Sequence, residues 1–346
     1  MAKVAVIGTT SWATTLAILL ARNGSEVVLY ARTEVEALSL EKDRENKRFL
    51  SGFQFPENMT VTSDMDNMMS GTEVIVLAVP SQSFSHNVKG LIPGMQEEYI
   101  FVSATKGLEG GTSRRMSEIL SSDIPSKFIR GISVLSGPNL SKEVVTGMPS
   151  ATVVASEQDQ IASRVQDLFL SKYFRVYKNS DVIGVELGGA LKNILAVGAG
   201  ISDGLGFGDN GKSSLITRGL SEVNRLAVAC GSNPLTIYGI SGLGDVMATC
   251  TSSLSRNRYV GECIGRGQNL NDILASMNNV AEGVYTIPEA LNIAKQFNVD
   301  MPITESISRV LRGELSPQQS VHDLMFRVPH NELRLYLGQT SCFFQQ

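Results

Sequence analysis

Residues 1–32, MAKVAVIGTTSWATTLAILLARNGSEVVLYAR, indicate the fold of the first half of the chain. A short apolar run, Val4–Ile7, stops at Gly8, and Thr14–Asn23 follows with apolar side chains at helical spacing. The next run, Glu26–Tyr30, favours a second strand. A strand, a glycine turn, a helix and another strand in this order predict a βαβ unit with a parallel sheet.

The alternation of strand and helix signals continues beyond this unit. Further strands are predicted at the apolar runs Val74–Val79, Tyr99–Ser103, Ile132–Leu135 and Ala151–Ala155. Continuous apolar strands separated by helices are typical of a parallel sheet that is covered by helices on both faces.

The second half of the chain has a different pattern. From about Asp181 the strand signals nearly vanish, and Val182–Ser202 is a long apolar helical segment rich in Gly and Ala. Further helices are predicted at Lys212–Cys230, Arg256–Gly265, Asn271–Ser276, Thr286–Phe297 and Pro302–Arg312. We therefore expect an α/β protein with a Rossmann-like, mostly parallel sheet domain over residues 1–178 and an all-helical domain over residues 179–327. A tail without clear periodicity follows at residues 328–346.

Composition narrows the possible functions. Of 346 residues, 42% are hydrophobic and 18% charged, and the net charge of -4 gives no electrostatic reason to expect nucleic acid or a membrane surface as a partner. Four scattered cysteines and three histidines argue against a disulfide framework, a metal site and a Ser-His-Asp triad. The sequence shows neither a signal segment nor an apolar run long enough for a membrane span, so a cytoplasmic location is expected.

The turn after the first strand, GTTSWA at residues 8–13, stands where a dinucleotide loop would carry G-x-G-x-x-G. Gly8 occupies the first glycine position, but Thr10 and Ala13 replace the other two. Two interpretations remain open from the motif alone. The loop binds a pyrophosphate with a hydroxyl as an added ligand, or it is an ordinary βα turn capped by Thr or Ser.

The end of the second predicted strand bears on the identity of a dinucleotide. NAD-specific proteins usually place Asp or Glu there for the ribose diol, whereas this chain has Tyr30-Ala31-Arg32. Arg32 offers a cation for a 2′-phosphate, which favours NADP(H) and leaves NAD(H) possible. The alternative is that Arg32 is an ordinary surface arginine.

The segment GGALKNILAVGAG, residues 188–200, places one lysine among small and apolar residues. A buried lysine is costly unless it is paired, and a lysine beside an anion can act as a general acid toward a carbonyl oxygen. The alternative is a helix-packing surface from which Lys192 reaches solvent, which explains the glycines but not the adjacent Lys192-Asn193 pair.

Polar clusters follow at DNGK (residues 209–212), SGLGD (241–245) and SRNR (255–258). In the last cluster, a hydroxyl, arginines and the start of a predicted helix converge as they do on a bound phosphate. Each cluster alone is commonly a helix start or a turn, but their occurrence together with Lys192 favours a functional site.

In these motifs the chain resembles the bacterial NAD(P)-dependent glycerol-3-phosphate dehydrogenases, over about residues 3–327. The matching segments are VAVIG…SW, VLAVPSQ, ATKGLE, SGPN…KEV, GALKN, DGLGFGDN, LITRGL, SGLGD, SRN and V-x-EG. The resemblance implies reversible reduction of dihydroxyacetone phosphate to sn-glycerol 3-phosphate, with Lys192 as general acid and base. It also implies a homodimer and a role in glycerophospholipid synthesis.

The resemblance assigns roles to individual positions. Cofactor contacts fall on the Gly8 turn and on Ser11, Trp12, Arg32, Lys106, Ser141, Arg256, Val280 and Glu282. Substrate contacts fall on Lys106, Gly137, Asn139, Lys192, Asp245, Ser255, Arg256 and Asn257. The chain departs from the family at Thr10, Ala13, Asn139 and Ser141, which bears on cofactor affinity and selectivity more than on the reaction.

Two rival functions remain. Another β-hydroxyacid-type dehydrogenase would share the domain plan but carries Lys-x-x-x-Asn, whereas Lys192 and Asn193 are adjacent here. A nucleotide-sensing protein would bind NADP without catalysis, which the altered glycine loop allows. The enzyme is favoured by the presence together of Lys106, Lys192, Asp245, Arg256 and Asn257.

Overall fold

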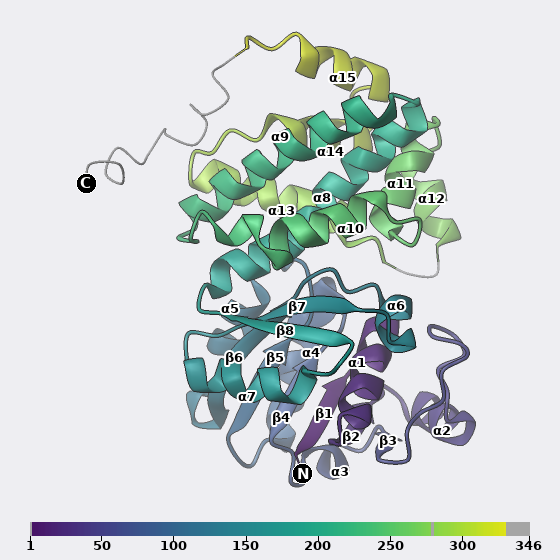
Figure 1. Cartoon of the computed structure of the whole chain (residues 1–346), viewed down its shortest axis with the longest axis vertical. Coiled ribbons are helices and arrows are strands. Elements are labelled where there is room, and N and C mark those ends of the chain that lie inside the picture. The colour runs from purple at the N-terminus through teal and green to yellow at the C-terminus, as the bar shows by residue number, and fades with distance from the viewer. Residues whose placement is uncertain (1, 278–279, 330–346) are drawn as a thin grey trace, which may run out of the picture. The chain divides into compact units, whose positions relative to one another are not determined.

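The computed structural model describes residues 2–277 and 280–329, so most of the predicted tail, with residues 330–346, lies outside the described residues. The chain divides into two compact units, Met1–Glu186 and Leu187–Gln346 (Figure 1). Each unit is described on its own below.

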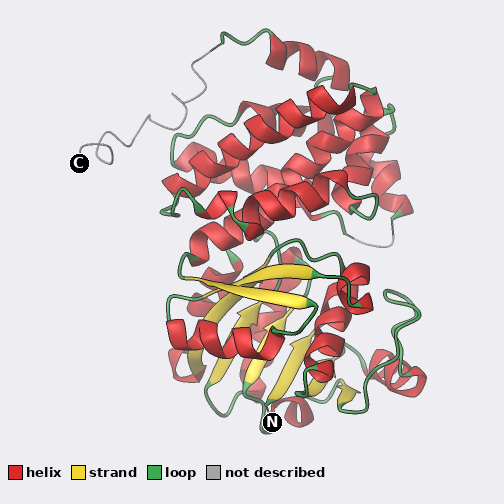
Figure 2. Ribbon diagram, in the orientation of Figure 1, coloured by secondary structure: helices red, strands yellow, loops and turns green. Residues whose placement is uncertain are grey.

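The first unit is built on one eight-stranded sheet with the order β3-β2-β1-β4-β5-β6-β7-β8 (Figure 2). The strands are β1 Lys3–Ile7, β2 Glu26–Tyr30, β3 Met59–Thr62, β4 Val74–Leu77, β5 Tyr99–Ser103, β6 Ile129–Ser136, β7 Ser150–Ala155 and β8 Phe174–Asn179. All neighbouring strands run parallel except β6 and β7, which are antiparallel. The predicted Rossmann-like, mostly parallel sheet is confirmed.

Helices cover both faces of this sheet, because alternate residues of each strand point to opposite sides. Val4 and Val6 of β1 join a core with α1 and α7, whereas Ala5 and Ile7 join a separate core with α4 and α5. The helices of this unit are α1 Ser11–Arg22, α2 Glu34–Asp43, α3 Met65–Met69, α4 Phe84–Leu91, α5 Met116–Asp123, α6 Ser141–Thr146 and α7 Asp159–Phe169.

The sequence did not predict β3 and β8, and both lie at the edges of the sheet. Their residues alternate between buried and more exposed positions, and both strands carry polar side chains. An edge strand does not need a continuous apolar run, and that run was the signal that identified the central strands.

Every regular element described in the second unit is helical (Figure 2). The helices are α8 Val182–Leu205, which begins in the first unit, α9 Gly208–Ala229, α10 Asp245–Thr251, α11 Arg256–Gly265, α12 Leu270–Ser276, α13 Glu282–Gln296, α14 Pro302–Leu311 and α15 Pro317–Met325. A Cβ added at Gly261 would lie only 1.9 Å from the Val197 carbonyl oxygen, so glycines let the backbones of α8 and α11 touch.

Among the described residues, α8 is the one helix long and apolar enough to cross a membrane. Of its most apolar window, 89% is buried inside the protein, as in the core helix of a folded domain. The glycines and apolar residues of α8 therefore serve helix packing.

Candidate active site

The glycine turn after β1 has the geometry expected of a dinucleotide loop. Gly8 has a φ of 103°, and a Cβ there would lie 2.8 Å from Val79 Cγ1, so a side chain does not fit. The Gly8 amide donates to the carbonyl of Tyr30 at the end of β2, at 3.1 Å. The turn lies between β1 and β4, where the strand order reverses, which is the usual ligand site of such sheets.

Thr10 is the N-cap of α1. Its hydroxyl accepts a hydrogen bond from the Ala13 amide at 3.2 Å and donates one to the Ala78 carbonyl at 2.9 Å. Both bonds are internal, so in this structure Thr10 acts as the cap of a βα turn rather than offering its hydroxyl to a ligand. Helix geometry leaves the amides of Ser11 and Trp12 without intrahelical acceptors, and these amides suit an anion.

The other residues assigned to the cofactor surround this helix start or the end of β2. The Trp12 indole Nε1 is buried and has no hydrogen-bond partner in the structure. Ser141, the first residue of α6, places its carbonyl oxygen 3.5 Å from Thr15 of α1. Arg32 lies two residues after β2 with an exposed side chain, and no carboxylate in the described part of the chain pairs with it. A donor without a partner, two amides and a cation therefore fit a dinucleotide here.

Lys106, Gly137 and Asn139 meet at the carboxyl ends of the parallel strands β5 and β6. Lys106 Nζ donates to the Gly137 carbonyl at 2.6 Å. A Cβ on Gly137 would lie 2.9 Å from the Cα of Thr152, so the close packing requires glycine. Asn139 Nδ2 donates to Thr152 Oγ1 at 3.2 Å, while its Oδ1 is buried without a partner. The structure thus brings these three predicted residues together.

In the helical unit, Lys192 is buried and paired. Its side chain is 9% exposed and that of Asp245 only 1%. Lys192 Nζ donates to Asp245 Oδ1 at 2.5 Å and to Thr249 Oγ1 at 2.7 Å. The alternative in which Lys192 reaches solvent from a packing surface is therefore wrong, although the glycines of α8 do serve packing.

A second polar chain begins next to Lys192. Asn257 Nδ2 donates to Asn193 Oδ1 at 2.8 Å, and the Gly283 amide donates to Asn257 Oδ1 at 2.9 Å. These bonds connect α8, the first turn of α11 and the first turn of α13. Glu282 is the first residue of α13, and Val280 precedes it with an exposed side chain.

The SRN segment forms the start of α11. Ser255 is the N-cap, and its hydroxyl accepts from the Arg258 amide at 3.3 Å. Ser255 and Asn257 are buried, whereas the Arg256 side chain between them is exposed. The start of α11 thus presents a guanidinium and helix amides, while its neighbours hold it in place.

The sequence interpretation did not assign two residues of this cluster, Thr249 and Asn193, to the site. Thr249 lies one helical turn after Asp245 on α10 and contacts the same lysine, so the i, i+4 spacing was the available signal. Asn193 was noticed only as the neighbour of Lys192. Cys250 next to Thr249 is fully buried, and this burial raises the pKa of its thiol to about 12, so it stays a neutral thiol. Within the described residues, no three His, Cys, Asp or Glu side chains are grouped as metal ligands.

A doubly wound sheet with a receptive glycine turn, and a separate helical unit with a buried lysine–carboxylate pair, define a dehydrogenase of the nicotinamide-dependent class. Family models narrow this class. The model of the NAD-dependent glycerol-3-phosphate dehydrogenase N-terminus matches residues 3–162, and that of the C-terminus matches residues 181–322. The chain belongs to this family, as the sequence resemblance predicted.

Individual relatives agree. The chain is 46% identical over 334 residues to a glycerol-3-phosphate dehydrogenase (NAD(P)+) of Dehalococcoides mccartyi, covering 96% of this chain and 93% of that protein. The corresponding enzyme of Chlorobium limicola is 44% identical over 95% of this chain and 99% of its own length. The crystal structure of glycerol-3-phosphate dehydrogenase from Coxiella burnetii superposes with a TM-score of 0.89, at 35% identity, over 94% of this chain and 99% of that one.

Proposed function

We propose that this chain reduces dihydroxyacetone phosphate to sn-glycerol 3-phosphate, reversibly, with Lys192 as general acid and base. The observation that carries the proposal is the pairing of Lys192 with Asp245 and Thr249 inside the helical unit. The carboxylate keeps a buried ammonium charged, and the hydroxyl fixes its direction.

In the direction of reduction, the ammonium of Lys192 donates a proton to the C2 oxygen as negative charge develops on it. Its positive charge also stabilises the developing alkoxide, and in the reverse direction the neutral amine accepts the hydroxyl proton. Asp245 and Thr249 hold the Nζ atom in one place, so no reorganisation is needed when charge appears.

The start of α11 is the proposed phosphate site. Arg256 supplies an exposed guanidinium, and the first amides of α11 point out of the helix toward an anion. The side-chain groups of Asn257 bond to Asn193 and Gly283, so Asn257 contributes through its amide and by holding the helix start.

The dinucleotide site is proposed at the Gly8 turn. The reduced nicotinamide supplies the hydride when it is bound. The amides of Ser11 and Trp12 face its pyrophosphate, and Lys106 and Ser141 are further proposed cofactor contacts. Lys106, Gly137 and Asn139, at the carboxyl edge of the sheet, are proposed substrate contacts. The late segment around Val280 and Glu282 is a further proposed contact.

Replacing the lysine tests the reaction. In Lys192→Ala, the turnover of dihydroxyacetone phosphate should fall by about a thousandfold, because both the proton and the stabilising charge are lost. The dissociation constant of NADPH, measured by its fluorescence, should change little. Lys295→Ala on α13 is the matched control and should keep full turnover.

The rival functions give different results in the same assay. Retained turnover in Lys192→Ala would remove this lysine from the mechanism. A wild-type protein that binds NADPH but does not oxidise it with dihydroxyacetone phosphate would be a sensor. Oxidation with a different ketone alone would indicate another β-hydroxyacid-type dehydrogenase.

NADPH is the proposed preferred cofactor, because the exposed, unpaired Arg32 follows β2 where a ribose contact is expected. In Arg32→Asp, the KM for NADPH should rise by about tenfold or more, since a phosphate would then face a carboxylate. The KM for NADH should stay the same or fall. An unchanged ratio of the two KM values would show that Arg32 does not contact the 2′-phosphate.

The family resemblance also supports a cytoplasmic homodimer that supplies the backbone of glycerophospholipids. Light scattering on the eluting peak of a sizing column measures the assembly directly. A mass of twice 37.3 kDa is expected.

A further inference from the structure

Glu186, one turn and a half before Lys192 on α8, has a buried side chain. Burial raises the pKa of its carboxyl group, while Arg115 and Ser117 act in the opposite direction. Its carboxylate accepts from Arg115 Nη1 at 2.7 Å, from the Ser117 amide at 2.8 Å and from the Ser117 hydroxyl at 2.5 Å. The exposed fractions of the Arg115 and Glu186 side chains are 16% and 6%. A buried carboxylate with three donors, at the positive end of α5, is held in one position.

The place of Glu186 in the chain gives this contact its significance. It is the last residue of the first unit, and all three of its donors belong to that unit. The helix continues without a break into the second unit, where Lys192 lies. The rise of an α-helix places the two residues about 9 Å apart along its axis. The hydrogen bonds of Glu186 therefore fix the first turns of α8, the helix that carries the proposed general acid.

Two glycines lie between Glu186 and Lys192 on α8, and they are a reason to hold the start of this helix in place. Gly188 and Gly189 follow Glu186, and a Cβ on Gly188 would lie 3.0 Å from the Ser241 carbonyl oxygen. Glycine pairs are places where helices bend. The close approach at Gly188 favours glycine, so bonds made outside this turn, such as those of Glu186, can limit its bending.

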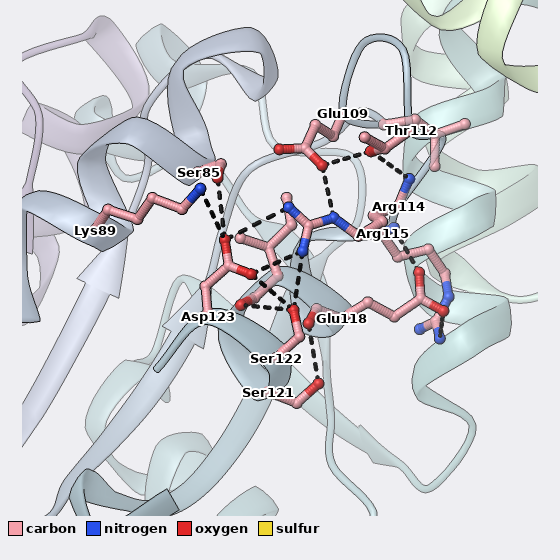
Figure 3. A network of polar contacts seen from close by, with 12 residues as sticks. Ser85, Lys89, Glu109, Thr112, Arg114, Arg115, Glu118, Ser121, Ser122 and Asp123 are labelled. Atoms are coloured by element: carbon pink, nitrogen blue, oxygen red, sulfur yellow. Dashed lines mark hydrogen bonds and ion pairs between the residues drawn. The ribbon is translucent and has the colours of Figure 1, made fainter. Parts of the chain in front are cut away.

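Arg115, the partner of Glu186, ends a loop that begins at Lys106. The loop from Lys106 to Arg115 closes on itself through two backbone hydrogen bonds: the Glu109 amide donates to the Arg114 carbonyl at 3.0 Å, and the Ser113 amide donates to the Glu109 carbonyl at 3.0 Å. Arg114 bonds to Glu109 at 2.7 Å and to Asp123 of α5 at 2.8 Å, and Figure 3 shows its guanidinium between the two carboxylates. The next residue, Arg115, bonds to Glu186. The tandem arginines thus tie one loop to α5 and to the first turns of α8.

We propose that the Arg115–Glu186–Ser117 cluster is a positioning element, which holds the first turns of α8 against the start of α5 and so steadies the helix that carries Lys192. This inference rests on the proposed function. None of the three residues touches the reacting atoms in this scheme. Their effect is on the placement of Lys192, and a misplacement of about 1 Å is enough to lower turnover by about a hundredfold.

Glu186→Gln is the test, because it keeps the shape of the side chain and removes its charge. We expect turnover to fall at least tenfold while the dissociation constant of NADPH stays within twofold. Hydrogen exchange should become faster in the segment of α8 after Glu186. Arg115→Lys should give the same changes to a smaller degree, and it replaces Glu186→Gln if that variant does not fold.

Glu73→Gln is the matched control. Glu73 accepts two hydrogen bonds from Arg164 of α7, at 2.8 and 2.6 Å. This ion pair lies in the same unit as Glu186 but does not involve α8. The variant should keep turnover within twofold and leave the exchange of α8 unchanged. Equal losses of turnover in the two variants would show general destabilisation and overturn the positioning role.

Two further results would overturn the positioning role, and a third would overturn the proposed function instead. Turnover of Glu186→Gln within twofold of the wild type, or unchanged exchange in α8, overturns the proposal. If the wild-type protein does not reduce dihydroxyacetone phosphate, the proposed function fails, and hydrogen exchange alone decides whether Glu186 anchors α8.

Discussion

The two halves of the candidate site differ in how their polar groups are satisfied. In the dinucleotide unit, Trp12 Nε1 and Asn139 Oδ1 are buried without partners, and Arg32 lies exposed. In the helical unit, Lys192 and Asn257 are buried within hydrogen-bonded chains of side chains. Buried groups without partners cost folding free energy, and a ligand can satisfy them. The first half thus has polar groups that a ligand can satisfy, whereas Lys192 and Asn257 in the second half are already hydrogen-bonded before a ligand binds.

This difference follows from the chemistry that each half has to perform. A dinucleotide brings its own reactive group, so its site needs donors and room. In the proposed mechanism, proton transfer depends on the placement of Lys192 Nζ, so this atom has to be held before the substrate arrives. Substitutions of Lys192 and its partners should therefore affect turnover, and those of Trp12 and Arg32 should affect cofactor affinity.

Asp245→Asn should have the largest effect. It leaves the buried ammonium of Lys192 without its carboxylate, so the charged form becomes more costly and the acid is lost. Turnover should fall by about a thousandfold, with NADPH affinity within twofold of the wild type.

The control for Asp245→Asn is another buried carboxylate in the same unit. Glu222→Gln also replaces a buried carboxyl group, but Glu222 bonds to the backbone amides of Ile303 and Thr304 instead of to Lys192. Its turnover should match the wild type. If both variants lose turnover equally, the difference between the two halves does not depend on the Lys192–Asp245 pair.

Much of the fold was predictable, because buried central strands and long apolar helices leave strong patterns. The apolar run Val4–Ile7 and the glycine turn after it predicted β1 and the start of α1 correctly. The edge strands β3 and β8 were missed, since each has one exposed side and no continuous apolar run. The apolar runs of β6 and β7 do not indicate that these two strands pair antiparallel.

The site was predictable where one residue conflicts with its surroundings. Lys192 stands out as a charge in an apolar helix, and its burial agrees with that reading. Thr10 did not stand out in this way, because one hydroxyl can cap a helix or bind a ligand. Glu186 was missed because its partner Arg115 is 71 positions away in the sequence. Partners that meet only through the tertiary fold leave no local pattern.

The pH dependence of the unfolding free energy measures what the burial of Glu222 costs in the helical unit. Burial raises the pKa of Glu222 to about 7, despite hydrogen bonds from Ile303 and Thr304. In the unfolded chain this carboxyl has its ordinary pKa, so between about pH 4.5 and 7 the folded protein holds a proton that the unfolded chain has lost. The stability from this group is complete below that window and falls as the pH rises through it.

Glu222→Gln mimics the protonated side chain and should remove this dependence. From pH 5 to pH 8, the wild type should lose about 2–3 kcal/mol of unfolding free energy relative to the variant. Urea unfolding at the two pH values measures this difference. Parallel curves for the two proteins would mean that Glu222 stays ionised in the folded state and that its burial is fully compensated.

Trp12→Phe should have the smallest effect, and it tests the receptive half most directly. The variant loses some packing but also removes a buried donor that has no partner, so the stability of the protein without cofactor should change little. If the dinucleotide satisfies this donor, the dissociation constant of NADPH should rise about fivefold to tenfold, the value of one hydrogen bond. Thermal unfolding with and without NADPH separates the two contributions, because only the bound form should lose stability. Equal losses in both forms would make Trp12 a packing residue, and the contrast between a receptive and a preorganised half would then rest on Asn139 and Arg32 alone.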